Sequence, residues 1–138
     1  MKAEELMIGD WVDVYHELTD ESGFYKPLRV TGIHYNDGIC FGDSTIESPW
    51  NDLKEFEEGV RPIPLTPEIL EKNGFEKHIS DIRMFFQHGE YHLSYYIVNK
   101  HFTIYNQIDG SLIQRVIVNV HELQHALKLC GIDKEIIV

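Results

Sequence analysis

Hydrophobic residues in the first third of the chain recur in short alternating runs, which is the pattern of β-strands. Residues 11–15 (Trp-Val-Asp-Val-Tyr) are rich in β-branched and aromatic types, and residues 28–35 alternate between apolar and polar positions. Asp37-Gly38 predicts a tight hairpin turn, because such turns need the positive φ values that glycine adopts readily. Residues 39–41 are therefore expected to return as a third strand.

A stiff segment and a short helix are predicted in the middle of the chain. Residues 61–65 contain two prolines, which favour an extended edge strand or a linker. Thr66 is a good N-cap for the helix that follows, and Asn73-Gly74 ends it. Phe75 is expected to fold back on Leu70, as the Schellman motif prefers. We interpret this helix as a structural connector without chemistry of its own.

From residue 82 the pattern predicts an antiparallel meander of four strands. The strands are expected at residues 84–86, 91–98, 101–106 and 112–118. A two-residue turn at Asn99-Lys100 would pair Ile97 with Phe102 and Tyr95 with Ile104. This register gives the meander one apolar face, made of Leu93, Tyr95, Ile97, Phe102 and Ile104.

A C-terminal helix is expected to cover that apolar face. Asn119 is a good N-cap and Glu122 stands three residues later, which is the spacing of a capping box, while Gly131 serves as the C-terminal cap. At about 100° per residue, His121 and His125 lie nearly opposite the apolar stripe of the helix and are expected to face solvent. The stripe consists of Val120, Leu123, Leu127 and Cys130.

The predicted elements define an α+β protein in two parts. Residues 1–65 form an N-terminal SH3-like small β-barrel, and residues 66–138 form the connector helix, the antiparallel β-meander and the covering C-terminal helix. The first assignment rests on the opening at residues 8–12 (Ile-Gly-Asp-Trp-Val), which resembles that of SH3-like barrels, with Trp50 as the expected core anchor of residues 45–56. Such barrels commonly bind peptides or nucleic acid through aromatic residues at loop ends. The candidate binding residues are Trp11, Tyr15, Phe24, Tyr25 and Trp50.

Charge narrows the classes of partner. The chain of 138 residues carries 23 Asp and Glu against 12 Lys and Arg, a formal net charge of -11. This charge disfavours direct binding to nucleic acid and to anionic membranes, and it suits a basic protein partner or mimicry of a nucleic acid. No apolar run approaches the roughly 18 residues that span a bilayer. Cys40 and Cys130 lie far apart, so we expect a cytoplasmic protein with reduced thiols, and a homodimer is left open.

His121-Glu122-x-x-His125 is the H-E-x-x-H pattern, in which two histidines bind a zinc ion and the glutamate takes a proton from a zinc-bound water. The alternative function is therefore a zinc-dependent hydrolase with zinc as its cofactor. A third ligand would have to come from upstream, with His88, His92 and His101 as candidates. Alternation places His92 and His101 on the sheet face away from the helix, and the capping box already explains Glu122.

Three blocks of the sequence resemble a group of small uncharacterised proteins from gut bacterial genomes and their phages or mobile elements. The blocks are residues 7–12, 62–75 (Pro-Ile-Pro-Leu-Thr-Pro-Glu-Ile-Leu-Glu-Lys-Asn-Gly-Phe) and 120–131 (Val-His-Glu-Leu-Gln-His-Ala-Leu-Lys-Leu-Cys-Gly). The resemblance implies no activity, because none is assigned to the group. Similar proteins carry other residues, such as Gln and Asn, in place of Glu122 and His125, which argues against zinc.

The sequence therefore favours a non-catalytic role over the zinc hydrolase. We expect no catalytic residue, no cofactor and no bound metal, and a protein partner whose identity the sequence does not give. The expectation rests on the acidic composition, the incomplete catalytic set and the aromatic residues of the N-terminal part.

Overall fold

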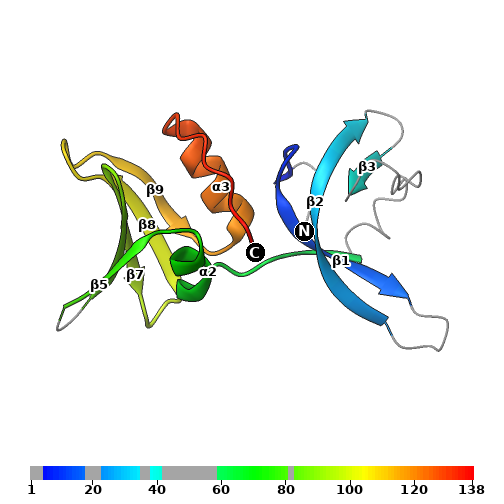
Figure 1. Ribbon diagram of the computed structural model, residues 1–138, viewed down its shortest axis with the longest axis horizontal. Coiled ribbons are helices and arrows are strands. Elements are labelled where there is room, and N and C mark those ends of the chain that lie inside the picture. Colours follow the sequence, from blue (N-terminus) through cyan, green and yellow to red (C-terminus); the bar gives the residue numbers. More distant parts are fainter. Residues whose placement is uncertain (1–4, 18–22, 35–37, 42–58, 81–82) are drawn as a thin grey trace. The chain divides into compact units, whose positions relative to one another are not determined.

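The computed structural model of this α+β protein describes residues 5–17, 23–34, 38–41, 59–80 and 83–138 (Figure 1). The chain divides into two compact units, Met1–Ile63 and Pro64–Val138, which we call the N-terminal and the C-terminal unit. In the described residues each unit is built on one antiparallel sheet, and helices α2 (Pro67–Lys72) and α3 (Val120–Leu129) belong to the C-terminal unit. The predicted α+β class is confirmed.

The N-terminal unit contains an antiparallel sheet of four strands in the order β3-β2-β1-β4. The strands are β1 (Trp11–Glu17), β2 (Gly23–His34), β3 (Gly38–Phe41) and β4 (Val60–Pro62). Strands β1 and β3 lie where the sequence pattern predicts them, whereas β2 begins five residues before its predicted start at residue 28. The antiparallel pairing of β2 with β3 is the one that a hairpin at Asp37-Gly38 requires. Residues 35–37 of that hairpin lie outside the described residues.

One face of this sheet carries the hydrophobic core of the N-terminal unit. Val12 and Val14 alternate inwards along β1, and the buried side chains that join them are Leu6, Val30, Ile39, Phe41 and Val60. A turn before β1 fixes where the strand begins. Gly9 adopts a φ of 95° there, and its N–H donates to the Val30 carbonyl at 2.7 Å.

The SH3-like barrel is not confirmed by the described part of the N-terminal unit. A barrel closes when its edge strands pair, and the described residues form an open sheet with β3 and β4 at its edges. The expected segment at residues 45–56, with Trp50, lies outside the described residues.

The connector helix has the predicted ends. Helix α2 (Pro67–Lys72) begins after Thr66, whose hydroxyl accepts from the Ile69 N–H at 3.3 Å. Gly74 has a φ of 80°, and the Phe75 N–H donates to the Leu70 carbonyl at 3.1 Å. These contacts confirm the expected cap and the return of the chain after it.

The C-terminal unit contains a five-stranded antiparallel sheet with its strands in chain order. The strands are β5 (Glu76–Ile79), β6 (Met84–His88), β7 (Tyr91–Tyr96), β8 (His101–Asn106) and β9 (Leu112–Ile117). The meander is confirmed, but the expected number of four strands is wrong. Strand β5 has a single large aliphatic residue, Ile79, because an edge strand can keep polar and charged residues at most positions.

The predicted register of β7 and β8 is wrong by two residues. Tyr95 pairs with Phe102 and Leu93 with Ile104, since four residues rather than two form the turn. Ile97, expected on the apolar face, lies in that turn with 63% of its surface exposed. Because side chains alternate with a period of two, a shift of two residues leaves the other predicted face residues on the inner face.

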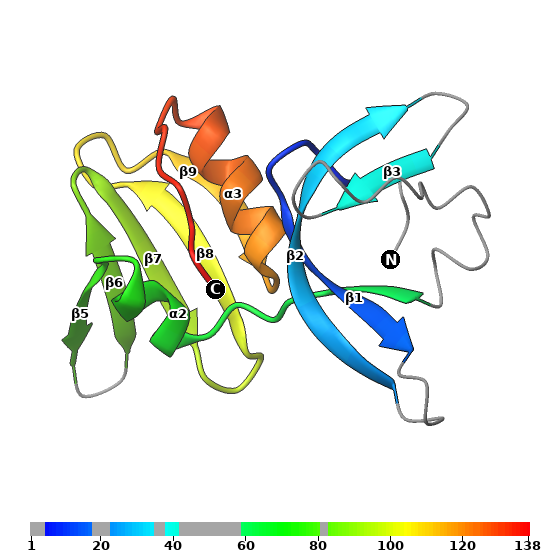
Figure 2. The same cartoon turned by 45° about the vertical axis from the view of Figure 1, so that its right-hand side comes forward.

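Two helices and the C-terminal segment lie on the same side of this sheet (Figure 1, Figure 2). Helix α3 (Val120–Leu129) begins after Asn119 and is followed by Gly131, with a φ of 72°. The Tyr91 hydroxyl donates to the Cys130 carbonyl at 3.2 Å and joins the end of α3 to β7. The core between these elements is made of Leu70, Phe75, Phe86, Leu93, Phe102, Ile104, Ile117, Val120, Leu123, Leu127 and Ile136.

Candidate functional site

The second face of the N-terminal sheet gathers aromatic and arginine side chains. Along β1, Trp11, Asp13 and Tyr15 alternate with the core residues Val12 and Val14 and therefore lie on the opposite face. Their cross-strand partners share that face. We call this set the outer face, and its residues are Trp11, Asp13, Tyr15, Tyr25, Pro27, Arg29 and Arg61.

Short contacts join the outer-face side chains at one end. The guanidinium of Arg61 lies 3.6 Å from the ring centroid of Tyr25, a cation–π contact. Nε and Nη2 of Arg61 each donate to Oδ2 of Asp13 at 3.3 Å. The rings of Tyr15 and Tyr25 lie 5.4 Å apart and are tilted by 60°. Because Arg61 contacts neighbours on both other strands, it links β4 to β1 and β2 on this face.

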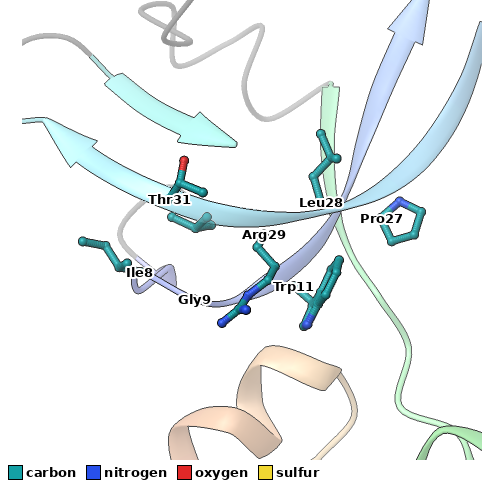
Figure 3. Close-up of a pocket in the computed structure, with 8 residues that line it drawn as sticks. Ile8, Gly9, Trp11, Pro27, Leu28, Arg29 and Thr31 are labelled. Atoms are coloured by element: carbon teal, nitrogen blue, oxygen red, sulfur yellow. The ribbon is translucent and has the colours of Figure 1, made fainter. Parts of the chain in front are cut away.

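A hollow of about 490 Å³ lies at the other end of the outer face. Trp11 and Arg29 extend from neighbouring strands to the same side of the sheet (Figure 3). The guanidinium of Arg29 lies 5.9 Å from the centroid of the Trp11 ring. The lining is Ile8, Gly9, Trp11, Pro27, Leu28, Arg29, Val30 and Thr31, mostly apolar with one cation and no carboxylate. An apolar wall with one charged group has the chemistry of a ligand-binding site.

The structure sorts the five predicted binding residues into three groups. Trp11 lines the hollow, and Tyr15 and Tyr25 contact each other, all three on strands rather than at the expected loop ends. Phe24 is 45% exposed, and alternation along β2 puts it on the face opposite Tyr25. Trp50 lies outside the described residues.

Sequence reasoning missed Arg29 and Arg61. Nothing in their own sequence neighbourhood marks them, since each stands as a single cation. They join the site through pairing, because Arg29 lies opposite Trp11 and Arg61 opposite Asp13. Only the register of the three strands could have identified them. That register is hard to predict from the sequence, because β4 follows β3 after a long intervening segment.

The acidic residues are concentrated in the N-terminal unit. Of the 23 Asp and Glu residues, 14 precede residue 64, against 5 of the 12 Lys and Arg residues. The outer face carries two of those five cations. The electrostatic field of this unit therefore attracts basic partners at long range. The outer face presents guanidinium groups that a bound partner would contact directly.

The His-Glu-x-x-His motif is the second candidate, and its glutamate is engaged in the helix cap. Oε2 of Glu122 accepts from the Val118 N–H at 2.6 Å and from the Asn119 N–H at 2.9 Å. The Asn119 side chain accepts in turn from the backbone of Glu122, which completes the capping box. The predicted structural role of Glu122 is confirmed.

Replacing Glu122 by alanine is expected to lower the free energy of unfolding by about 1–2 kcal/mol, because two N–H groups lose their acceptor. Glu122→Gln keeps an acceptor oxygen and should cost less than half as much. Chemical denaturation followed by circular dichroism measures both. A loss below about 0.5 kcal/mol for the alanine variant would show that the cap does not stabilise the helix.

The predicted exposure of the two motif histidines is wrong for His121. Only 4% of His121 is exposed and His125 is half-buried, with their ring centroids 5.7 Å apart. Helix α3 buries a wider arc than its apolar stripe predicts, since Gln124 and Ala126 are buried as well. The predicted stripe included only apolar residues, so it covered less of the helix surface than is buried in the structure.

The described residues contain no group of three or more His, Cys, Asp or Glu side chains placed to hold a metal ion. Of the three upstream candidates for a third ligand, His88 lies on the inner face, with its ring 5.2 Å from that of Phe75. His92 and His101 lie on the face away from α3, as predicted. Burial raises the pKa of the Cys130 thiol, which disfavours the thiolate that binds metals.

Comparison of the chain with protein-family models, with curated proteins and with solved structures finds no match. In the described parts of the chain, none of the helices is both long and apolar enough to cross a membrane. The outer face and its hollow are therefore interpreted from their own chemistry.

Proposed function

We propose that this protein is a non-catalytic protein-interaction module whose N-terminal unit binds a protein partner on the outer face. Tryptophan, tyrosine and arginine are the residue types enriched at the centres of protein interfaces. The observation that carries the proposal is the grouping of these types on one face of a small sheet, namely Trp11, Tyr15, Tyr25, Arg29 and Arg61.

The proposal includes an SH3-like architecture for the N-terminal unit. It is supported by the long strand β2, which pairs with β1 along one part and with β3 along another. A register irregularity between Val30 and Gly32 separates the two parts, and such bulges bend strands where small barrels turn a corner. In this architecture the outer face corresponds to a surface on which short protein segments dock.

The partner that fits best has a basic surface around the segment that docks. Because 14 acidic residues lie in the N-terminal unit, its field attracts positive surfaces and speeds their encounter. The contact itself relies on ring stacking and on the guanidinium groups of Arg29 and Arg61. We place the interaction in the cytoplasm, in the phage or mobile-element setting that the sequence blocks suggest.

Affinity capture from the native host at physiological salt tests the proposal. The immobilised full-length protein is expected to retain a partner, and the Arg61→Ala variant is expected to bind it at least about tenfold more weakly, because truncating a central interface arginine commonly costs more than 1.4 kcal/mol. Titration of the purified partner by calorimetry gives the ratio of dissociation constants.

Lys26→Ala is the matched control for that titration. Lys26 is also an exposed cation of the N-terminal unit, and it lies opposite the core residue Val14 rather than on the outer face. Both variants make the net charge more negative by one, so a long-range effect on a basic partner would be the same in both and would favour binding. Equal losses in both variants, or capture of no partner at all, would contradict the proposed binding face.

A further inference from the structure

The C-terminal sheet has a second face that no described element of its own unit covers. Helices α2 and α3 and the C-terminal segment lie on the inner side (Figure 2). The outward side chains of β5 to β8 are mostly histidines and aromatic residues. We call this surface the histidine–aromatic face, and its principal residues are His78, Phe85, His92, Tyr96, His101 and Tyr105.

The rings on this face form a continuous row across four strands. The rings of His78 and Phe85 stack at 5.0 Å, and Phe85 meets His92 edge-on at 4.5 Å. His92 meets Tyr105 at 5.4 Å, and the Tyr105 hydroxyl lies 3.3 Å from the Ser94 hydroxyl. The row is therefore ordered before any partner binds, which lowers the entropy cost of docking on it.

Charge distinguishes this face from the rest of the chain. The protein carries a net charge of -11, whereas the outward positions of β5 to β8 hold one carboxylate, Glu76 on the edge strand. Its Oε2 lies 3.8 Å from Nε2 of His78. Burial and the neighbouring His78 lower the pKa of His92, which keeps that imidazole neutral at pH 7.

We propose that the protein forms a homodimer in which the histidine–aromatic faces of two copies pack against each other. Copies with a net charge of -11 repel each other, most strongly through their acidic N-terminal units, and a face with one carboxylate on the other unit is where they can approach. Its aromatic residues are typical of interface centres. This partner and this surface are independent of the proposed binding face on the N-terminal unit.

The size of the face fits a weak dimer. With β9 included, the 27 strand residues of the sheet, at about 3.4 Å each on strands about 4.8 Å apart, cover about 440 Å² in projection, so two copies bury about 900 Å². This area is in the range of weak, transient protein interfaces. We expect a dissociation constant on the order of 10 µM.

Sedimentation equilibrium of the full chain at pH 7.5 tests the dimer. The parent protein, of 16.1 kDa per chain, is expected to approach twice that mass at about 200 µM and to dissociate on dilution. The Gln87→Glu/Thr103→Glu variant places two carboxylates on the face and should remain monomeric, because four added charges would meet in the dimer.

The Val98→Glu/Asn99→Asp variant adds the same charge in the turn between β7 and β8, where Val98 is 94% exposed, and it should still dimerise. Circular dichroism checks that each variant is folded. If the face variant does not fold, Tyr96→Glu replaces it, since Tyr96 is 44% exposed at the end of β7.

A monomeric parent at about 200 µM would overturn the proposal. A face variant that still dimerises, or a turn variant that does not, would overturn it as well.

Discussion

Replacing Phe102 by alanine is expected to lower the free energy of unfolding of the C-terminal unit by about 3–5 kcal/mol. Phe102 is fully buried in the central part of the sheet. Its ring lies 5.9 Å from that of Phe86 and 4.6 Å from that of Tyr95. Truncation removes both ring contacts and leaves a cavity that the paired strands cannot collapse to fill. Urea denaturation followed by far-ultraviolet circular dichroism measures the loss.

Thr103→Ala is the control for this prediction. Thr103 follows Phe102 on the same strand, but its side chain lies on the histidine–aromatic face and is half-buried. We expect a loss of about 1 kcal/mol or less from this change. Equal losses at the two positions would mean that the inner face is not the core of the C-terminal unit.

Asn73→Ala is expected to cost about 2–3 kcal/mol, the second largest effect, because Asn73 fastens the C-terminal segment to α2. Its Oδ1 accepts from the Ile137 N–H at 2.8 Å, and its Nδ2 donates to the Ile137 carbonyl at 2.7 Å. Nδ2 also donates to the Ile69 carbonyl at 2.7 Å. In the alanine variant these backbone groups would lose the amide as their hydrogen-bond partner. The loss is costly because the neighbouring Ile136 is fully buried.

Asn99→Ala, in the exposed turn between β7 and β8, is the matched control and should change stability by less than about 0.5 kcal/mol. Asn73→Asp separates the two halves of the contact, since a carboxylate keeps the acceptor and loses the donor. Native-state hydrogen exchange at the Ile137 amide should quicken in Asn73→Ala before the sheet amides do. Unchanged exchange at Ile137 would contradict the role assigned to Asn73.

Local patterns in the sequence were sufficient for most elements of the fold. Thr66 and Asn119 mark helix starts through their own side chains, and Gly74 and Gly131 mark the ends through positive φ, so each prediction needed only neighbouring residues. Strand β5 could not be predicted in this way, because an edge strand satisfies its hydrogen bonds by pairing with β6 and needs little apolar content. The role of Asn73 in holding Ile137 depends on residues 64 positions apart, which no local pattern encodes.

The candidate sites were predictable only in part, because they too depend on contacts between residues far apart in the sequence. Trp11, Tyr15 and Tyr25 stood out as aromatic residues, but their arrangement on one face depends on the register of β1 and β2. Arg61 joins them through β4, whose position the sequence left open between an edge strand and a linker. The capping role of Glu122 was predictable, since its spacing from Asn119 is a local signal, whereas the burial of His121 was not.

Hydroxyl-radical footprinting of the complex with the captured partner tests the proposed function most directly, because it reports on the aromatic side chains themselves. Oxidation of Tyr15 and Tyr25 is predicted to fall when the partner binds, since both rings lie on the outer face. Tyr96, at the end of β7 in the other unit, should keep its reactivity. Unchanged oxidation of Tyr15 and Tyr25, with protection confined to residues 64–138, would contradict the assignment of the outer face as the binding surface.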